Sequence, residues 1–183
     1  MYPGVADTRV YDLWMRIEQA SRLLLRRALE RDGAAILRIY NAEVLTSTAT
    51  LDLVPRTEEG QRSWMTAHSG AYPALVAESG AKVIGFSSLS PYRPRPGYST
   101  AVEDSVYVTA EARGRGVGRL LLEGAVEAAK AHGFHSVVGR ISAEQTASIR
   151  LHEACGFTTV GVEREIGRKF GRFIDVAIVQ LLL

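Results

Sequence analysis

The stretch that decides the fold of this 183-residue chain reads Val106-Tyr107-Val108-Thr109-Ala110-Glu111-Ala112-Arg113-Gly114-Arg115-Gly116-Val117-Gly118-Arg119. An apolar strand ends here, a short polar turn follows, and a glycine-rich loop leads directly into an amphipathic helix. Glycines let the backbone turn its N–H groups toward one point close to a ligand, and the start of a helix adds the positive end of its dipole. The three arginines supply charge-assisted donors for phosphate oxygens. The stretch therefore predicts a pyrophosphate site.

Other phosphate or nucleic-acid motifs fit this loop less well. Glycines at 114, 116 and 118 do not have the G-x-G-x-x-G spacing, and no Lys-Ser/Thr pair completes G-x-x-x-x-G-K-[ST]. RGG-type RNA-binding segments are repeated and disordered, whereas this one is single and runs into a helix. A solvated, arginine-rich turn with no ligand is the remaining alternative.

Composition indicates a soluble globular protein with no global attraction to polyanions. Hydrophobic residues make up 46% of the chain, and the net charge is only +2, so neither nucleic acid nor a membrane is expected as a partner. Cys155 is the one cysteine, which excludes an internal disulfide, and we expect no metal site. The first twenty residues carry five charges, and no apolar run approaches the length of a membrane span, so the sequence predicts a cytoplasmic protein.

The order of elements around the loop predicts a mixed sheet flanked by helices. We expect strands at residues 22–27, 74–78, 82–89, 102–108, 136–141, 157–163 and 173–182. We expect helices at residues 34–44, 58–68, about 118–132 and 146–154, with Asp32 as the cap of the first. Residues 1–21 are predicted to be an N-terminal extension with a short helix over 10–20, and residues 22–183 a single α/β (α+β) domain.

The loop resembles the signature of the GCN5-related N-acetyltransferase (GNAT) superfamily. Arg113-x-x-Gly116-x-Gly118 is similar to that family's Gln/Arg-x-x-Gly-x-Gly/Ala motif, and it follows the fourth predicted strand, where the family places it. The resemblance implies the GNAT fold, with about seven strands, and acetyl-CoA as co-substrate. It implies that Val106, Tyr107 and Val108 hydrogen-bond the pantetheine arm like an added strand. The residues it assigns to the diphosphate are Arg113, Gly114, Arg115, Gly116, Val117, Gly118 and Arg119.

Within that superfamily, three motifs resemble the phosphinothricin and methionine sulfone acetyltransferases. Residues 103–108 are similar to the subgroup's Glu-x-Ser-Val-Tyr-Val, and residues 148–157 to its Ser-x-x-x-His-Glu-x-x-Gly-Phe/Tyr. Residues 167–176 also match, with Phe173 where the subgroup usually has Trp. Gln145 stands where an Asn commonly contacts CoA, and glutamine keeps that amide on a longer stem. Gln145 and Ser148 are therefore predicted CoA contacts.

Acetyl transfer to an amine requires a neutral amine, a stabilised oxyanion and a proton for the leaving thiolate. Glu103, at the start of the strand that presents the thioester, is the predicted base, acting directly or through a water; a surface carboxylate is the alternative. His152 stands where many superfamily members have a tyrosine that protonates the thiolate; a histidine packed on the helix is the alternative. A backbone N–H near Val108 is expected to stabilise the oxyanion.

The acceptor is expected to be small and to resemble an amino acid. Arg93 resembles the position at which the subgroup binds the substrate carboxylate, with Glu103 beside the amine. Arg95 is a rival for this role, and an ordinary exposed loop arginine is the alternative. Cys155 is expected to be a buried apolar residue rather than a nucleophile.

The resemblance thus implies direct N-acetylation of a small-molecule amine such as phosphinothricin or methionine sulfone. A GNAT enzyme acting on a protein N-terminus or another amine is the first alternative, and a non-catalytic acyl-CoA sensor is the second. Dimers are common among relatives, so a homodimer is expected as well.

Overall fold

The computed structural model describes residues 23–183, so the extension and short helix predicted within residues 1–21 lie outside the described residues. The strands are β1 Leu23–Arg27, β2 Ala74–Ser79, β3 Lys82–Pro91, β4 Ala101–Val108, β5 Ser136–Ser142, β6 Thr158–Lys169 and β7 Arg172–Leu182. The helices are α2 Gly33–Thr46, α3 Glu58–Ala67, α4 Val117–Ala131 and α5 Thr146–Ala154. This order confirms the predicted single domain with a seven-stranded mixed sheet. Between residues 23 and 183, no helix is long and apolar enough to cross a membrane.

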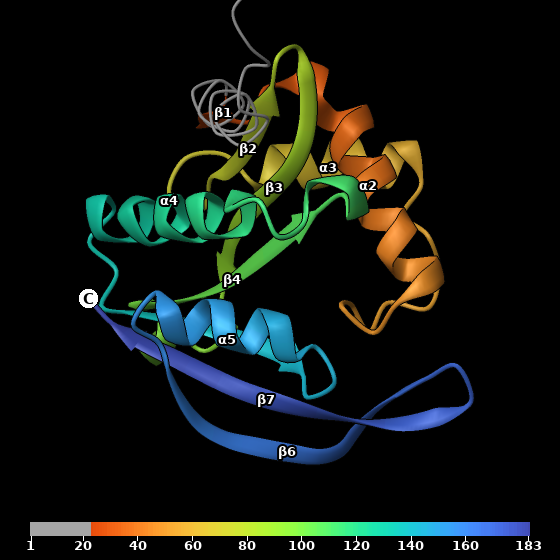
Figure 1. Cartoon of the computed structure of the whole chain (residues 1–183). Helices are drawn as coiled ribbons and strands as arrows, with labels where there is room; N and C mark the ends of the chain where they lie inside the picture. Colours follow the sequence, from red (N-terminus) through yellow and green to blue (C-terminus); the bar gives the residue numbers. More distant parts are fainter. Residues whose placement is uncertain (1–22) are drawn as a thin grey trace, which may run out of the picture.

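The sheet has the order β1-β2-β3-β4-β5-β7-β6 (Figure 1). All neighbouring strands are antiparallel except β4 and β5, which are parallel. These two pair only over Ala101–Glu103 and Ser136–Val138, although β4 continues to Val108 and β5 to Ser142. The sheet therefore opens between its two central parallel strands.

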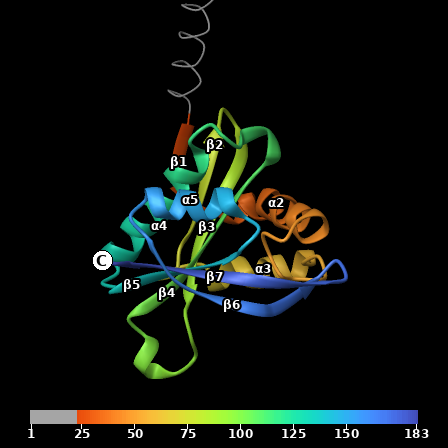
Figure 2. The ribbon, with the colours of Figure 1, turned by 60° about the horizontal axis from the view of Figure 1, so that its bottom comes forward.

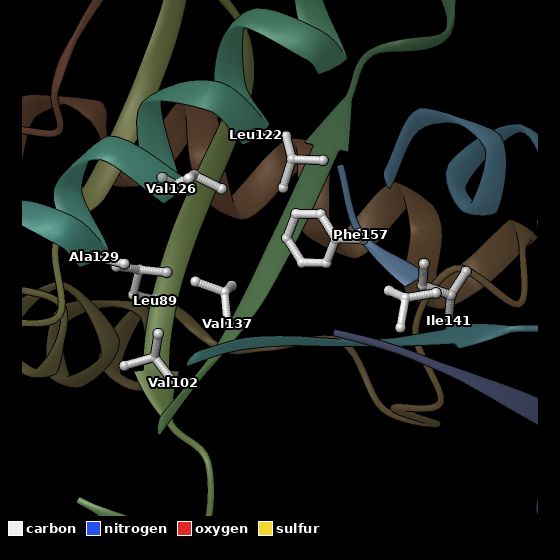
Figure 3. Close-up of a cluster of buried hydrophobic side chains, with 10 residues drawn as sticks. Leu89, Val102, Leu122, Val126, Ala129, Val137, Ile141 and Phe157 are labelled. Atoms are coloured by element: carbon white, nitrogen blue, oxygen red, sulfur yellow. The ribbon is translucent and has the colours of Figure 1, made fainter. Parts of the chain in front are cut away.

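Helices cover the two faces of the sheet, α4 and α5 on one side and α2 and α3 on the other. Figure 3 shows Leu122, Val126 and Ala129 of α4 packed over three strand residues, Leu89, Val102 and Val137. On the other face, Tyr40 of α2 meets Tyr107 of β4 edge to face, with ring centroids 5.3 Å apart. Successive side chains of a strand point to opposite faces, so these contacts show which face of the sheet each remaining side chain of β4 and β5 occupies.

The β6–β7 hairpin is longer than the sequence indicates, because β6 continues past residue 163 to Lys169 through a register irregularity between Glu163 and Gly167. Near its tip, the buried Lys169 ammonium donates to the carbonyl oxygens of Thr50, at 2.7 Å, and Glu43, at 3.4 Å. Glu43 lies in the last turn of α2, where the helix dipole favours a positive charge. The hairpin thereby fixes the segment that follows α2.

Asp32 stands at the N-cap position of α2, but the predicted capping role is wrong. Its side chain makes no hydrogen bond to the helix. The carboxylate instead accepts from the Arg26 guanidinium at 2.6 Å and from the Leu29 backbone N–H at 2.7 Å. A strong ion pair to β1 thus takes the oxygens that a cap would use.

Replacing Leu122 by alanine tests the packing under α4. We expect Leu122→Ala to lower the free energy of unfolding by about 2 to 5 kcal/mol, because Leu122 is fully buried and the cavity left behind costs more than the lost transfer energy. Urea denaturation measures the change. Leu45→Ala, on the exposed side of α2, is the control and should change it by only about 0.5 kcal/mol; equal losses would contradict the packing described.

Candidate active site

A cavity of about 790 Å³ lies where β4 and β5 part. This volume is in the range of small-molecule sites. Predicted site residues that line it are Glu103, Val106, Tyr107, Val108, Arg113, Gly114, Gly116, Gly118, Arg119, Gln145, Ser148 and His152. Arg93, Arg115 and Val117 are not part of this lining. The structure thus gathers the predicted base, acid, strand and glycine loop around one space.

Both strands turn backbone groups into the gap. The Thr109 N–H donates to the Ile84 carbonyl at 2.9 Å. Because hydrogen-bonded and non-hydrogen-bonded pairs alternate along an antiparallel ladder, the backbone N–H and C=O groups of Val106 and Val108 point away from β3. On β5, the Ala143 N–H donates to the Asp175 carbonyl at 2.9 Å, and the same alternation turns the backbone of residues 140 and 142 away from β7. An extended ligand can therefore pair with either strand.

The glycine loop has a backbone that few other residues adopt. Gly114 and Gly116 have φ of +72° and +80°, and a Cβ at either position would meet no atom within 4 Å. Gly116 directly precedes α4, and no side chain caps that helix. The first N–H groups of α4 therefore lack a side-chain acceptor and can bind an anion. This open cradle fits a diphosphate.

Carboxylates hold two of the loop arginines, Arg113 and Arg119. Arg113 forms an ion pair with Glu43 of α2 and donates to the Val108 carbonyl at 3.3 Å. Arg119 pairs with Glu123, one turn further along α4, at 2.7 Å. Backbone amides and the start of the helix thus remain the most direct anion-binding groups, with the arginines adding positive charge nearby.

His152 is tied to Asp104, a residue that the sequence reasoning did not single out. Its Nδ1 lies 2.8 Å from the Ser148 carbonyl, which can only accept, so Nδ1 carries a proton. Its Nε2 lies 3.1 Å from Oδ2 of Asp104. The side chain is 3% exposed; burial lowers the pKa of His152, but the hydrogen bond and charge of Asp104 outweigh burial and the net pKa is raised. The one clue in the sequence is that Asp104 shares a strand face with the apolar Val102.

Gly139 of β5 makes room for this pair. A Cβ at residue 139 would lie 3.2 Å from both Oδ1 of Asp104 and Cδ2 of His152, and 2.8 Å from a Val179 methyl. The missing side chain therefore lets β4 and α5 join across β5.

Glu103 reaches the cavity from the opposite face of the sheet, because it alternates with Val102 and Asp104 along β4. It is half-buried, and no residue between 23 and 183 gives its carboxylate a hydrogen bond. Burial raises the pKa of Glu103, and the nearby Arg140 guanidinium opposes that rise. Glu103 thus has two properties expected of a general base: its pKa is raised, and no residue between 23 and 183 hydrogen-bonds its carboxylate oxygens.

The two candidate arginines for an acceptor have different surroundings. Arg93 lies exposed in the β3–β4 connection, which projects from the body of the fold (Figure 2), and its guanidinium stands 5.0 Å from the centre of the Tyr92 ring. Arg140, which sequence reasoning missed, lines the cavity and pairs with Glu163 at 2.6 Å. Its signal in the sequence was slight: one arginine inside an otherwise uncharged strand.

The sequence of this chain matches a known protein family. The family model described as "Acetyltransferase (GNAT) family" matches residues 34–157, more than half of the chain. The chain belongs to the GNAT family. The predicted family and fold are therefore confirmed, and the protein is an acetyl-CoA-dependent N-acetyltransferase.

Its relatives include enzymes of the predicted subgroup. The chain is 40% identical over 157 residues to the phosphinothricin N-acetyltransferase of Streptomyces coelicolor, covering 84% of this chain and 92% of the relative. It is 38% identical over 161 residues to the L-methionine sulfoximine/L-methionine sulfone acetyltransferase of Pseudomonas paraeruginosa, covering 87% and 94%. The structure of yncA from Salmonella typhimurium with its cofactor acetyl-CoA matches at a TM-score of 0.86 and 36% identity, covering 88% of this chain and 94% of that one. These matches confirm acetyl-CoA as co-substrate.

The only cysteine of the sequence, Cys155, is partly buried and packs against the core under α4. Burial raises the pKa of its thiol, which opposes formation of the thiolate that a covalent route would need.

Exchanging the carboxylate of Asp104 for an amide tests the pair with His152. The raised pKa means that the wild type gains stability from protonated His152 below the unfolded pKa and loses it as pH rises through the folded pKa. In Asp104→Asn, the amide can donate to a neutral ring, so this loss should disappear. We expect the gap in unfolding free energy between wild type and variant to narrow by roughly 1.4 kcal/mol per pH unit over that window. Denaturation at several pH values measures it; parallel profiles would contradict the pairing.

Proposed function

We propose that this enzyme acetylates the amine of a small amino-acid-like acceptor, with phosphinothricin and methionine sulfone as the first compounds to test. The observation that carries the proposal is that Glu103, a half-buried carboxylate with a raised pKa, opens into the cavity beside the parted strands. The names of the Streptomyces and Pseudomonas relatives support the same acceptor class.

In this proposal, the co-substrate lies along β4 with its diphosphate on the glycine loop. The backbone amides from residue 113 to residue 119 hold the diphosphate, and the guanidinium groups of Arg113, Arg115 and Arg119 strengthen the local positive charge. The backbone of Val106 and Val108 pairs with the pantetheine arm. Gln145 and Ser148 at the start of α5 complete the site, and Thr48 accepts from the Gln145 amide at 3.2 Å.

The base and the oxyanion donor both come from β4. Bound acetyl-CoA supplies a thioester, whose acetyl group passes to the acceptor nitrogen as the C–S bond breaks and the CoA thiol leaves. Glu103 takes the proton from the acceptor ammonium, directly or through a water, so that the nitrogen lone pair can attack. A backbone N–H in the part of β4 that faces the gap donates to the thioester oxygen as negative charge develops on it, and that of Val106 lies nearer to Glu103 than that of Val108.

His152 is proposed to return a proton to the sulfur. Asp104 favours the charged imidazole through its contact with Nε2 and raises the pKa of His152, which places a proton donor next to the cavity wall. Releasing it requires the bond to Asp104 to break, and the ring can then recover a proton from solvent after the thiol departs. A purely structural His152 would instead leave kcat unchanged in Asp104→Asn.

Three further predictions stay open for this chain: a cytoplasmic location, the N-terminal extension and a homodimer. An observation that supports the homodimer is that the β6–β7 hairpin exposes six large apolar side chains, Val160, Val162, Ile166, Phe170, Phe173 and Leu182. Exposed apolar side chains of this kind are candidates for contact with a second copy.

Replacing Glu103 by glutamine tests the base. Glu103→Gln should lower kcat by about 10²- to 10⁴-fold, the usual contribution of general base catalysis, while the KM for acetyl-CoA stays within about twofold. Thiol release from acetyl-CoA measures both. The wild-type rate should rise with pH through a pKa above the ordinary glutamate value. Glu127→Gln, on the exposed side of α4, is the matched control; an unchanged kcat in Glu103→Gln would remove this residue from the mechanism.

Adding a methyl group at Gly116 tests the phosphate loop. Gly116→Ala should weaken CoA binding by roughly 5- to 30-fold, since a left-handed backbone costs alanine about 1 to 2 kcal/mol and a shifted loop misdirects its amides. Calorimetric titration with CoA gives the Kd. Gly80→Ala is the control, because Gly80 also has a positive φ and open space but lies in the β2–β3 turn. Equal binding by both variants would place the diphosphate elsewhere.

A further inference from the structure

Arg140 and Glu103 lie on the same face of the sheet, in the same cavity. Val137 and Ile141 of β5 belong to the core under α4, so Arg140 points to the opposite face. Glu103 is on that face too, because its neighbours Val102 and Asp104 are buried on the α4 side. In the β4–β5 ladder, Glu103 pairs with Val138, two residues before Arg140. The carboxylate and the guanidinium are thus diagonal neighbours at the point where the strands part.

Most of the Arg140 guanidinium is available for a ligand. Of its five N–H donors, the residues from 23 to 183 engage one, through the 2.6 Å bond to Oε2 of Glu163. The side chain is 25% exposed and lines the cavity, so the remaining donors are neither deeply buried nor turned to bulk solvent. Glu163 holds the guanidinium from one side and leaves its fork free for a second carboxylate.

Arg93, the arginine that the family resemblance favours, lacks this placement. It is exposed, lies outside the cavity lining and stacks near Tyr92. Its charge also affects the pKa of Glu103 less than that of Arg140 does, which agrees with a greater distance.

We propose that Arg140 is the residue that selects the acceptor, binding the carboxylate of an α-amino acid whose amine lies at Glu103. This inference rests on the proposed function and names the group that recognises its substrate. In an α-amino acid, one carbon atom separates the carboxylate from the amine. The cavity offers the Arg140 guanidinium beside the Glu103 carboxylate, so the acceptor carboxylate can pair with Arg140 while the amine lies at Glu103. An amine without a carboxylate leaves the Arg140 donors unpaired and gains nothing from them.

Two matched acceptors and four proteins test the proposal. The acceptors are methionine sulfone and the amine that remains when its carboxylate is removed. The proteins are the wild type, Arg140→Ala, Arg140→Lys and Arg93→Ala. Thiol release from acetyl-CoA gives kcat and KM for each pair, and melting temperatures show whether each variant is folded.

We expect Arg140→Ala to raise the KM for methionine sulfone about 10- to 100-fold, the effect of losing hydrogen bonds between charged groups. The KM for the decarboxylated amine and for acetyl-CoA should stay within about threefold. Arg140→Lys keeps the charge without the planar fork and should fall between wild type and Arg140→Ala. Arg93→Ala should resemble the wild type. The acidic limb of kcat/KM should move to higher pH in Arg140→Ala, because a cation that lowers the pKa of Glu103 has been removed.

Other outcomes overturn the proposal in distinguishable ways. Transfer to both acceptors with equal efficiency, or a KM effect in Arg93→Ala but not in Arg140→Ala, would refute the role of Arg140 and leave amine acetylation intact. Absence of thiol release from the wild type with either acceptor would refute the proposed acceptor class, and the role of Arg140 with it.

Discussion

The separation of β4 from β5 after three paired residues is the constraint on which the rest of the site depends. Backbone N–H and C=O groups inside a protein need partners, and a sheet that opens in its middle leaves two rows of them facing one space. An extended arm can fill that space as a strand would. The opening also gives access to both faces of the sheet, so that Glu103 and His152 meet the same cavity from opposite sides. One local change in pairing thus creates the ligand groove and separates the two titratable groups.

Two polar contacts keep this opening in shape. On the α4 side, the 3.1 Å contact between His152 and Asp104 links α5 to β4 past the bare backbone of Gly139. On the α2 side, the ion pair of Arg113 with Glu43 ties the glycine loop to the helix that covers the other face. Buried polar groups such as His152 and Asp104 are costly unless they are paired, which favours one arrangement of the walls over alternatives.

Sequence reasoning predicted the element order well, because glycine turns, alternating strands and the amphipathic α4 are local patterns. The motif around Gly116 led to the family, and the chain's own geometry placed most predicted residues in one cavity. The residues that sequence reasoning missed have roles that depend on contacts between positions far apart in the chain. Asp104 acquires its role only from a histidine 48 positions away, and Arg140 is notable only once the facing strand is known. Asp32 shows the reverse case, since a good local capping signal lost to an ion pair with Arg26.

The lysine near the tip of the β6–β7 hairpin has a consequence for how the molecule matures. Lys169 bonds the carbonyls of Glu43 and Thr50, which precede it by 126 and 119 residues, and the segment it holds contributes to the cavity wall. Contacts that span so much of the chain require a large loop to close and tend to form late. A nascent polypeptide in which the β6–β7 hairpin is not yet synthesised would therefore contain its glycine loop but have an incomplete groove. The groove could then bind a ligand only after the β6–β7 hairpin has been synthesised and has folded onto this segment.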